Sequence, residues 1–419
     1  MYSFLIISGV QYNSTNHFAV ISFFIIEFMV YIRVNFVNKK FQWLIIAKDE
    51  KPTLSQEGLK KFIPDGYDPE LGWIRKPNTE HNEKGRDGIT KWTINLKGAR
   101  NNPGFENLNS KISCYGDSFV FCRQVNDDET WEQQLSKLKE TNVINFGVGN
   151  YGIDQALLRM KREYQKNKTQ TVILGVVPDT ISRIVSVWKH YYEYGNTFGF
   201  KPRFIVKNNQ LQLIQNPIND ESKFYKYGNY LGQIRENDFF YRNKFKKEIL
   251  HFPYCITILK NIRRNYGIIK WVRKIQSLKN SKKDFSEIEW NAMKIIMKTN
   301  LEWRVKLFQD EQITLLLKKI IEEFVLFSKQ NQFKPVLVIL PQKDDVNFIK
   351  KNFHFYEKFL EELCDLKELQ IMDTTKDFLQ VKNLDNLYSD KNEYGGHYSA
   401  EGNQKIATIL NHKLSKNSL

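Results

Sequence analysis

The amino-acid sequence predicts an α/β fold, in which helices cover both faces of a five-stranded parallel sheet. Two observations predict it. Five short apolar segments follow one another from residue 111 onwards, and segments with one apolar helical face separate them. Strands that are apolar throughout are typical of parallel sheets, because such sheets are buried on both faces.

The five expected strands are short apolar runs that end at turn-forming residues. They cover residues 111–116, 142–148, 170–177, 334–342 and 368–375. Between and after them, apolar residues recur at helical spacing, and the first such segment begins with acidic residues, which suit a first helical turn. These helices are expected at residues 128–140, 154–166, 352–366 and 400–414.

A large insertion separates the third and fourth expected strands. This insertion, residues 184–333, begins with an aromatic run and continues with an expected hairpin at 203–214 and with basic helical segments. We interpret it as an aromatic and helical cap subdomain on a core formed by residues 111–183 and 334–419. Residues 51–110, rich in turns and charge, are expected to form an extended lead-in packed on that core.

Residues 1–50 form a separate N-terminal segment, in which residues 18–32 are apolar apart from Ser22 and Glu27. This stretch is shorter than the roughly 20 residues that span hydrocarbon, and a glutamate at mid-depth is costly. A buried soluble helix is the alternative, but we expect an apolar helix that anchors the chain in a membrane. The basic residues that follow it place the body in the cytoplasm by the positive-inside rule.

The net charge of +16 makes nucleic acid or an anionic membrane surface conceivable partners. The lysines, however, are scattered along the whole chain, and the largest local cluster, residues 279–285, has no interleaved stacking aromatics. We therefore expect no nucleic-acid partner. The four cysteines form no CxxC pair and show no zinc-ligand spacing, so neither a disulfide framework nor a metal site is expected.

Small polar residues follow the first expected strand directly, at Gly116, Asp117 and Ser118. Ligands of parallel sheets bind beyond the carboxyl ends of the strands, so a sharp turn here would present the Ser118 hydroxyl at that edge. A serine is a nucleophile only where a base takes its proton. His397, in a glycine-rich loop before the last helix, is expected at the same edge. The alternative is that Ser118 caps a following helix.

These segments resemble the SGNH (GDSL-type) hydrolases, whose fold is a flavodoxin-like three-layer sandwich. The family's strand followed by Gly-Asp-Ser matches residues 116–118, so the resemblance makes Ser118 the nucleophile and its N–H an oxyanion donor. The family's late histidine, shortly before a helix that starts with Glu-Gly-Asn, matches His397 and residues 401–403. No metal or organic cofactor is implied.

The second block of the family is an Asn-led strand with a glycine turn, and "NFGVGNYG" at residues 145–152 is similar to it. The resemblance places Gly149 and Asn150 at the second oxyanion donor, because backbone N–H groups in turns stabilise the charge that develops in acyl transfer. The resemblance as a whole covers roughly residues 111–183 and 334–414.

Two positions depart from the family's pattern. Where the family has an Asn-Asp pair after its third strand, this chain has Asp179 and Thr180, so the third oxyanion donor is expected to be Thr180 or Ser182, or to be absent. Three residues before the histidine, the family's acid is replaced by a tyrosine. Glu393 or Asp390 could act as the triad acid, or Ser118 and His397 could work as a dyad.

The N-terminal half also resembles membrane-anchored members of this family that are associated with cell-envelope polysaccharide. The resemblance is carried by Glu27 and Arg33, by "LGW" and "KP" at residues 71–77, and by "INLKGAR" at residues 94–100. It implies an extracytoplasmic body, in conflict with the charges that flank the apolar segment, and we follow the resemblance.

Together the residues and the resemblance predict a serine-dependent esterase or O-acyltransferase that acts on an acylated cell-envelope carbohydrate or another ester. Asp117, Asp179 and His190 are candidate substrate contacts, although Asp179 is also placed to cap a helix and His190 lies within the aromatic run. The alternative is a non-catalytic glycan-binding or envelope assembly protein on a degenerate scaffold of the same family.

Overall fold

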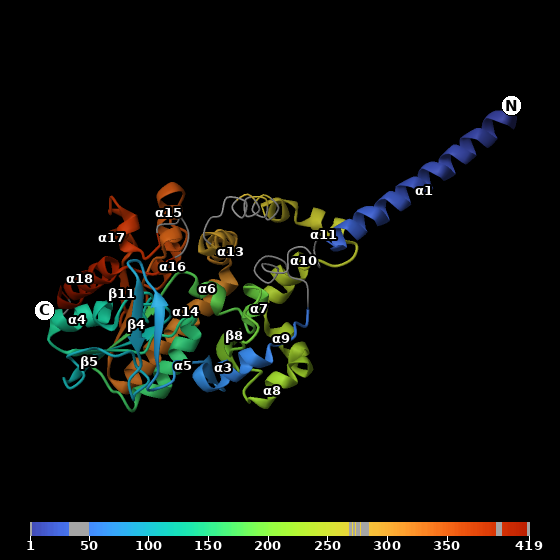
Figure 1. The fold of residues 1–419 in the computed structure, drawn as a ribbon. Helices are drawn as coiled ribbons and strands as arrows, with labels where there is room; N and C mark the ends of the chain where they lie inside the picture. The colour runs from blue at the N-terminus through green and yellow to red at the C-terminus, as the bar shows by residue number, and fades with distance from the viewer. Residues whose placement is uncertain are drawn as a thin grey trace. The chain divides into compact units, whose positions relative to one another are not determined.

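The computed structural model describes residues 2–32, 50–267, 285–390 and 396–416, together with positions 270, 273 and 277. Its central sheet has five parallel strands in the spatial order β11-β10-β7-β5-β6. Figure 1 labels β5 and β11 of this sheet. The strands are β5 (Ser110–Gly116), β6 (Asn142–Asn145), β7 (Thr171–Val176), β10 (Lys334–Ile339) and β11 (Gln370–Asp373). Numbered along the chain, this order is 2-1-3-4-5, the flavodoxin-like order. The predicted α/β class and five-stranded parallel sheet are therefore confirmed.

Helices cover both faces of the sheet. The α4 helix (Trp131–Lys139) packs against the C-terminal α18 helix (Ala400–Lys416), and both bury apolar side chains on one face of β5, β7 and β10. The α5 helix (Ile153–Tyr164) and the α14 helix (Glu311–Asn331) contact each other and the same strands. Successive residues of the central strands are buried on alternate faces, which explains why each strand is apolar throughout.

The part of the chain that the structure describes contains further helices and strands. The remaining α-helices are α1 (Tyr2–Ile32), α3 (Gln56–Gly66), α6 (Thr180–Arg183), α7 (Lys189–Tyr192), α8 (Ser222–Tyr225), α9 (Leu231–Asn237), α10 (Lys246–Glu248), α11 (Tyr254–Lys260), α13 (Phe285–Leu307), α15 (Lys343–Lys351), α16 (Glu357–Glu362) and α17 (Thr375–Leu379). Three antiparallel pairs join β1 (Tyr67–Asp68) to β2 (Gly72–Trp73), β3 (Glu80–Lys84) to β4 (Ile89–Thr93), and β8 (Arg203–Lys207) to β9 (Gln210–Ile214). The hairpin expected at 203–214 is thus present, and Asn208 and Asn209 adopt the positive φ of its two-residue turn.

Two elements end earlier than the sequence pattern suggests. The strand expected at 142–148 stops at Asn145, because the Asn145 side chain accepts a hydrogen bond from the Gly147 N–H (2.9 Å) and donates to the Val120 carbonyl (2.7 Å). The helix expected at 352–366 is reduced to α16. The aromatic residues before it, Phe355 and Tyr356, pack against Phe308 instead.

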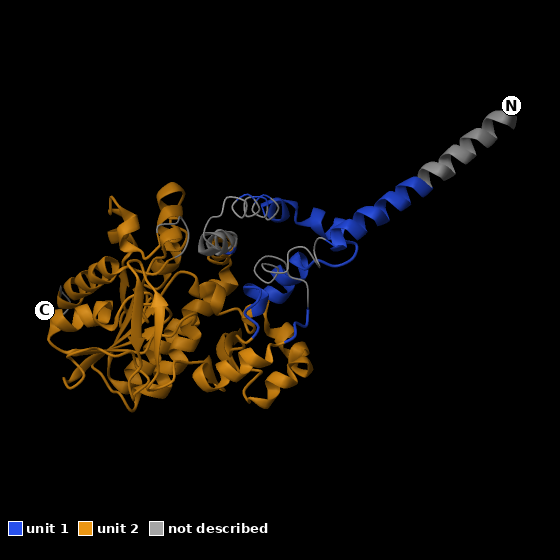
Figure 2. Cartoon of the chain, in the orientation of Figure 1, with its two compact units in different colours: residues 1–53, 190–197, 240–296 blue, residues 54–189, 198–239, 297–419 orange. Residues whose placement is uncertain are grey.

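The chain divides into two compact units (Figure 2). One unit contains the sheet and comprises residues 54–189, 198–239 and 297–419. The other comprises residues 1–53, 190–197 and 240–296. In this second unit the carboxylate of Glu27 on α1 accepts hydrogen bonds from the backbone N–H groups of Tyr254 and Cys255, 2.6 Å each, at the start of α11. The glutamate inside the apolar stretch therefore caps a helix.

The prediction of a membrane-anchored chain with an extracytoplasmic body is wrong. Among the residues that the structure describes, no helix is both long and apolar enough to cross a bilayer. Residues 18–32 belong to α1, and the acidic side chain in their middle is used within the protein. The predicted fold included an N-terminal apolar anchor helix at this stretch, and that part of the prediction is not supported.

Candidate active site

Residues 118–124 form a turn, the serine turn, directly after Asp117. It lies where the strand order of the sheet reverses, between β5 and β7. A Cβ atom on Gly116 would lie 2.1 Å from the Gly175 carbonyl oxygen of β7, so only glycine lets the two strand ends approach this closely. The Asp117 carboxylate accepts hydrogen bonds from the N–H groups of Phe119 (2.8 Å) and Val177 (3.2 Å), which joins the turn to the end of β7. Crevices at such reversal points are the usual ligand sites of open parallel sheets.

Ser118 follows directly and is 7% exposed. The residues after it form turns, and no helix begins at Ser118, so the alternative of a serine helix cap finds no counterpart. The carboxylate of Asp117 takes the local N–H instead. Within the described residues, the Ser118 hydroxyl and its N–H form no hydrogen bond, which leaves both groups free for a ligand.

Arg100 supports the turn after Ser118 from the lead-in segment. Its buried guanidinium donates to the carbonyl oxygens of Phe121, Cys122 and Val125 at 2.5–2.6 Å and pairs with Asp127 at 2.7 Å. Four acceptors at one guanidinium fix the backbone of a segment that has no ladder hydrogen bonds of its own. The conformation of the serine turn thus depends on a residue outside the expected core.

The turn after β6 approaches Ser118 from the other side. A Cβ atom on Gly149 would lie 4.0 Å from the Ser118 Cβ. The Gly149 carbonyl accepts a hydrogen bond from the Trp73 indole (2.9 Å), and the Trp73 carbonyl accepts one from the Tyr151 hydroxyl (2.5 Å). The N–H groups of Gly149 and Asn150 donate to no other group in the described part of the chain, so both are available to an oxyanion.

His397 lies against the same turn as Ser118. Its ring centroid is 4.9 Å from that of Phe119, the residue after the serine. Its Nδ1 lies 3.0 Å from Oε1 of Gln124, which also accepts hydrogen bonds from the His397 N–H (3.2 Å) and the Ser389 hydroxyl (2.7 Å). Because that oxygen can only accept, Nδ1 carries the proton and Nε2 is left as the basic nitrogen. No hydrogen bond joins Ser118 to His397 in the described structure.

The pKa of His397 lies well below its ordinary value. Burial is the main cause, and the positive charges of Arg123 and Arg183 add to it. The imidazole is therefore neutral at neutral pH, the form that accepts a proton.

The sequence analysis missed Gln124, which occupies the place behind the histidine where a triad carboxylate would stand. Of the expected acids, Asp390 lies beside Gly396, since a Cβ atom there would be 2.7 Å from the Asp390 Cβ. The Asp390 carbonyl accepts a hydrogen bond from the Lys343 ammonium (3.0 Å). Glu393 lies outside the described residues. The only sequence signal for Gln124 is its place in the turn that follows the serine.

Asp117 and Asp179, two candidate substrate contacts, are joined by Arg183. The Arg183 guanidinium lies 3.2 Å from Asp117 and 3.1 Å from Asp179. Burial raises the pKa of Asp117, whereas the Arg183 cation and the N–H groups of Phe119 and Val177 act to lower it. The Asp179 charge that would repel an oxyanion is thus paired with a cation, and its carboxylate forms no cap hydrogen bond at α6.

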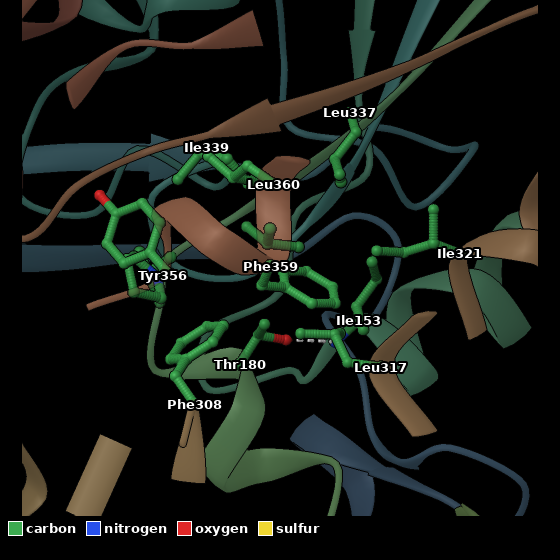
Figure 3. A pocket seen from close by; sticks show the side chains of 13 residues that line it. Ile153, Thr180, Phe308, Leu317, Ile321, Leu337, Ile339, Tyr356, Phe359 and Leu360 are labelled. Carbon is green, nitrogen blue, oxygen red and sulfur yellow. Dashed lines mark hydrogen bonds between the residues drawn. The ribbon is translucent and has the colours of Figure 1, made fainter. Parts of the chain in front are cut away.

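The side chain of Thr180 lines an apolar cavity (Figure 3). Its hydroxyl oxygen accepts a hydrogen bond from the Ile153 N–H at the start of α5 (2.8 Å). The rest of the cavity wall comes mainly from β7, β10, α14 and α16, and Ser118 is not part of it. The hydroxyl of Ser182, the other expected donor, is buried without a hydrogen-bond partner in the described structure.

His190 belongs to the second compact unit. Its ring packs against Tyr191, Tyr194 and Phe245, and its Nδ1 accepts a hydrogen bond from the Gly195 N–H (3.2 Å). These contacts are those of a packed aromatic cluster. Within the described residues, no group of three His, Cys, Asp or Glu side chains is placed to hold a metal ion.

Comparison with known proteins gives little beyond this geometry. No family model and no curated protein matches the chain. One similar solved structure is assigned to the lipolytic G-D-S-L family, from Desulfitobacterium hafniense DCB-2, with 11% identity, a TM-score of 0.34, and coverage of 73% of this chain and 99% of that one. Another is an acetyl xylan esterase, AlAXEase, with 12% identity, a TM-score of 0.33, and coverage of 71% and 96%. With TM-scores this low, the fold assignment rests on the strand order.

Proposed function

We propose that this chain is an ester hydrolase or O-acyltransferase of SGNH type that works through an acyl-enzyme at Ser118. One observation carries the proposal. The turn that starts at Ser118 also holds, through Gln124, the Nδ1–H of His397, so that the basic Nε2 remains for a serine hydroxyl. Nucleophile and base are thus held by one short turn at the reversal point of the sheet.

In the first half-reaction, the Ser118 Oγ attacks the ester carbonyl while Nε2 of His397 takes the hydroxyl proton. A tetrahedral oxyanion forms and then expels the alcohol, which receives the proton from the imidazolium. Water or a second alcohol attacks the acyl-enzyme in the same manner, and this restores Ser118 and releases an acid or a new ester. A neutral His397 at the start suits this cycle, and its lowered pKa keeps it neutral.

The oxyanion would be held by backbone donors from two turns. The N–H groups of Ser118, Gly149 and Asn150 have no acceptor among the described residues, and Gly149 lies beside the serine. One such donor contributes roughly 3–4 kcal/mol of transition-state stabilisation in a serine enzyme. Thr180 is a weaker candidate for the third donor, because its side chain lines an apolar cavity of which Ser118 is not part.

The proposed substrate class is the one that the sequence resemblance implies, an acylated cell-envelope carbohydrate. Transfer and hydrolysis share the first half-reaction, and they differ in whether a sugar hydroxyl or water accepts the acyl group. Product analysis with a labelled acyl donor, with and without added oligosaccharide, distinguishes the two.

Covalent labelling tests the proposal directly. A fluorophosphonate should label the native protein and not the Ser118→Ala variant. Ser328→Ala serves as the control, because this buried serine lies on α14 and bonds only its own helix (2.7 Å to the Val325 carbonyl). Labelling that persists in Ser118→Ala, or a native protein that never reacts, would contradict the proposal.

A second function is favoured by two observations. Ser118 and His397 share no hydrogen bond in the described structure, and an amide stands in place of the triad acid. A non-catalytic glycan-binding protein would retain this arrangement of residues without the reaction. It predicts carbohydrate binding to the native protein and to Ser118→Ala with equal affinity, and no fluorophosphonate labelling of either.

A further inference from the structure

Arg75, in the lead-in segment just after β2, projects its guanidinium toward the serine turn. The guanidinium carbon lies 4.5 Å from the centre of the Trp92 ring and 5.1 Å from that of Phe121. Phe121 belongs to the turn that begins at Ser118. The Arg75 cation therefore contacts two neighbouring aromatic rings, as in cation–π interactions.

The same guanidinium lies beside the proposed oxyanion donors. A Cβ atom on Gly149 would be 4.0 Å from Nη2 of Arg75 and 4.0 Å from the Ser118 Cβ. Because both atoms lie 4.0 Å from the same point, the distance between Nη2 of Arg75 and the Ser118 Cβ is at most the sum of these two distances. A substrate held at Ser118 would have its acyl or alcohol portion within reach of this cation.

Arg75 has no anionic partner in the described structure. It forms no ion pair or hydrogen bond there, and its Nε is buried without an acceptor. The nearby carboxylate of Glu83 is already paired with Arg123 (2.5 Å). The other arginines around the turn are matched as well, Arg100 by Asp127 and Arg183 by Asp117.

An unmatched cation in this position is unfavourable for the folded protein. Burial, together with the repulsion of Arg123 and Arg100, lowers the pKa of Arg75 to about 10, although Glu83 acts in the opposite direction. Arg75 still carries its charge at neutral pH. A bound ligand of opposite charge would offset this cost.

We propose that Arg75 binds a carboxylate, or another anionic oxygen group, that the substrate carries close to its ester. This inference rests on the proposed function, because it places the anion relative to an ester at Ser118. A guanidinium carries parallel N–H donors, which match a carboxylate in a bidentate manner. The substrate class is thereby narrowed to esters of acidic compounds, such as those in which the acyl group or the alcohol bears a carboxylate.

The kinetic test compares matched esters with and without the negative charge. The anionic charge is placed on the acyl side in mono(4-nitrophenyl) succinate against 4-nitrophenyl acetate, and on the alcohol side in 4-acetoxybenzoate against 4-acetoxybenzamide. The native protein should prefer one anionic ester by about tenfold or more in kcat/KM, the range expected of a charged hydrogen bond. In Arg75→Gln this preference should disappear because KM for the anionic ester rises. The kcat/KM for the neutral ester should change by less than about twofold.

Two further variants serve as controls. Arg75→Lys keeps the charge and should retain part of the preference, whereas Lys97→Gln removes an exposed charge from the same segment and should leave both rates unchanged. If Arg75→Gln lowers kcat for anionic and neutral esters alike, Arg75 acts on the oxyanion that they share, and the proposal is wrong. A preference that survives in Arg75→Gln also overturns it.

A binding measurement separates this inference from the proposed function. Succinate should bind the Ser118→Ala variant in calorimetry at constant ionic strength, and Arg75→Gln in that background should weaken binding by at least about tenfold. If fluorophosphonate fails to label Ser118 while succinate binding still depends on Arg75, the catalytic proposal fails and the anion site stands. If Ser118 is labelled but neither succinate binding nor ester preference depends on Arg75, only the present inference is wrong.

Discussion

Gln124 accepts three hydrogen bonds from the segment that carries His397, and none of the donors is charged when the imidazole is neutral. An amide oxygen in this place orients the ring and fixes its tautomer, as a carboxylate would. Unlike a carboxylate, it adds no negative charge and therefore leaves the pKa of His397 low. Orientation and charge, which a triad acid supplies together, are thus separated here.

We expect Gln124→Glu to move the acid limb of the kcat/KM profile to higher pH. A carboxylate facing Nδ1 favours the imidazolium and raises the pKa of His397, so the neutral base is lost at a higher pH. Gln124→Met, which keeps the length and removes the acceptor, should lower kcat by about tenfold or more without raising that pKa. Unchanged profiles in both variants would mean that Gln124 does not orient the base.

Arg123 should influence the same pKa from the opposite direction. Its cation lowers the pKa of His397, so the neutral imidazole persists to pH values below the ordinary histidine range. In Arg123→Gln the pKa of His397 should rise, and activity should be lost at a higher pH than in the native protein. The pH–rate profile measures the shift, with Lys97→Gln as a charge-matched control that should leave the profile in place.

At this scale the sequence indicated the residues that we propose to react and missed those that contact them. Ser118 and His397 stand in recognisable patterns, because a nucleophile and a base need particular neighbours in the chain. Gln124 and Arg75 have no such patterns. Their roles depend on contacts between residues that are distant in the chain. Gln124 lies 3.0 Å from Nδ1 of His397, and Arg75 contacts the rings of Trp92 and Phe121.

At the scale of elements, the contact between β5 and β7 determines where the serine turn begins. At the point of closest approach Gly116, the last residue of β5, lies opposite Gly175, the last residue but one of β7. A Cβ on Gly116 would meet the Gly175 carbonyl at 2.1 Å and a Val120 methyl at 2.4 Å. Neither the backbone of a central strand nor the buried valine can move far in a packed core.

Gly116→Ala should therefore destabilise the protein by about 3 kcal/mol, the upper range for overpacking a core. It should also reduce fluorophosphonate labelling, since the displaced strand end carries Ser118. Gly232→Ala is the matched control, because a Cβ at this helical glycine of α9 would meet nothing within 4 Å. Urea unfolding measures both. Equal stability of the two variants would mean that the strands can separate without cost.

The strands themselves were predicted within a few residues, because uninterrupted apolar runs have few other uses in a chain of this composition. The errors came from side chains that act on the backbone. Asn145 ends β6 early by bonding the N–H of Gly147. At the start of α4, Thr130 caps the helix by accepting the Gln133 N–H (3.1 Å), so the acidic residues before it form a separate 3₁₀ turn.

Across the sheet-bearing unit as a whole, a chain of buried charges joins the ends of three strands. From Asp117 after β5 it passes to Arg183 and to Asp179 after β7. Asp179 lies 3.7 Å from Arg304 of α13, which in turn pairs with Asp344 (2.7 Å) and Asp345 (2.5 Å) at the start of α15. Removing one member leaves its partners charged and buried, which is costly.

Arg304→Met should reduce the free energy of unfolding by about 3–5 kcal/mol at pH 8, the effect of breaking a buried pair. The loss should be smaller at pH 5. Burial raises the pKa of Asp345 to about 7, against the opposing effect of Arg304, so the folded state holds a proton that the unfolded state has released above about pH 4. The contribution of Asp345 to stability is therefore largest in acid and falls as the pH rises through about 7. At pH 5 the folded state holds Asp345 in its neutral form, so the loss of the Arg304 cation costs less there.

Urea unfolding at pH 5 and pH 8 measures this difference, with Arg304→Lys as the variant that keeps the charge. A loss for Arg304→Met that is equal at the two pH values would contradict the linkage. This network could not be predicted from the sequence, because its members are distant in the chain and each of them alone has the character of an ordinary surface residue. Only the packing of α13 and α15 at the strand ends makes them a unit.

The amide behind the histidine also bears on which esters the proposed active site would cleave quickly. After proton abstraction the imidazolium faces an uncharged oxygen, so the intermediate in which it exists receives less electrostatic support than a carboxylate would give. From that intermediate, the imidazolium either transfers its proton to the departing group or returns it to Ser118 as the ester re-forms. Departing groups that leave readily as anions, such as enols and thiols, need little help from the acid, and we expect turnover to fall steeply with increasing basicity of the departing group.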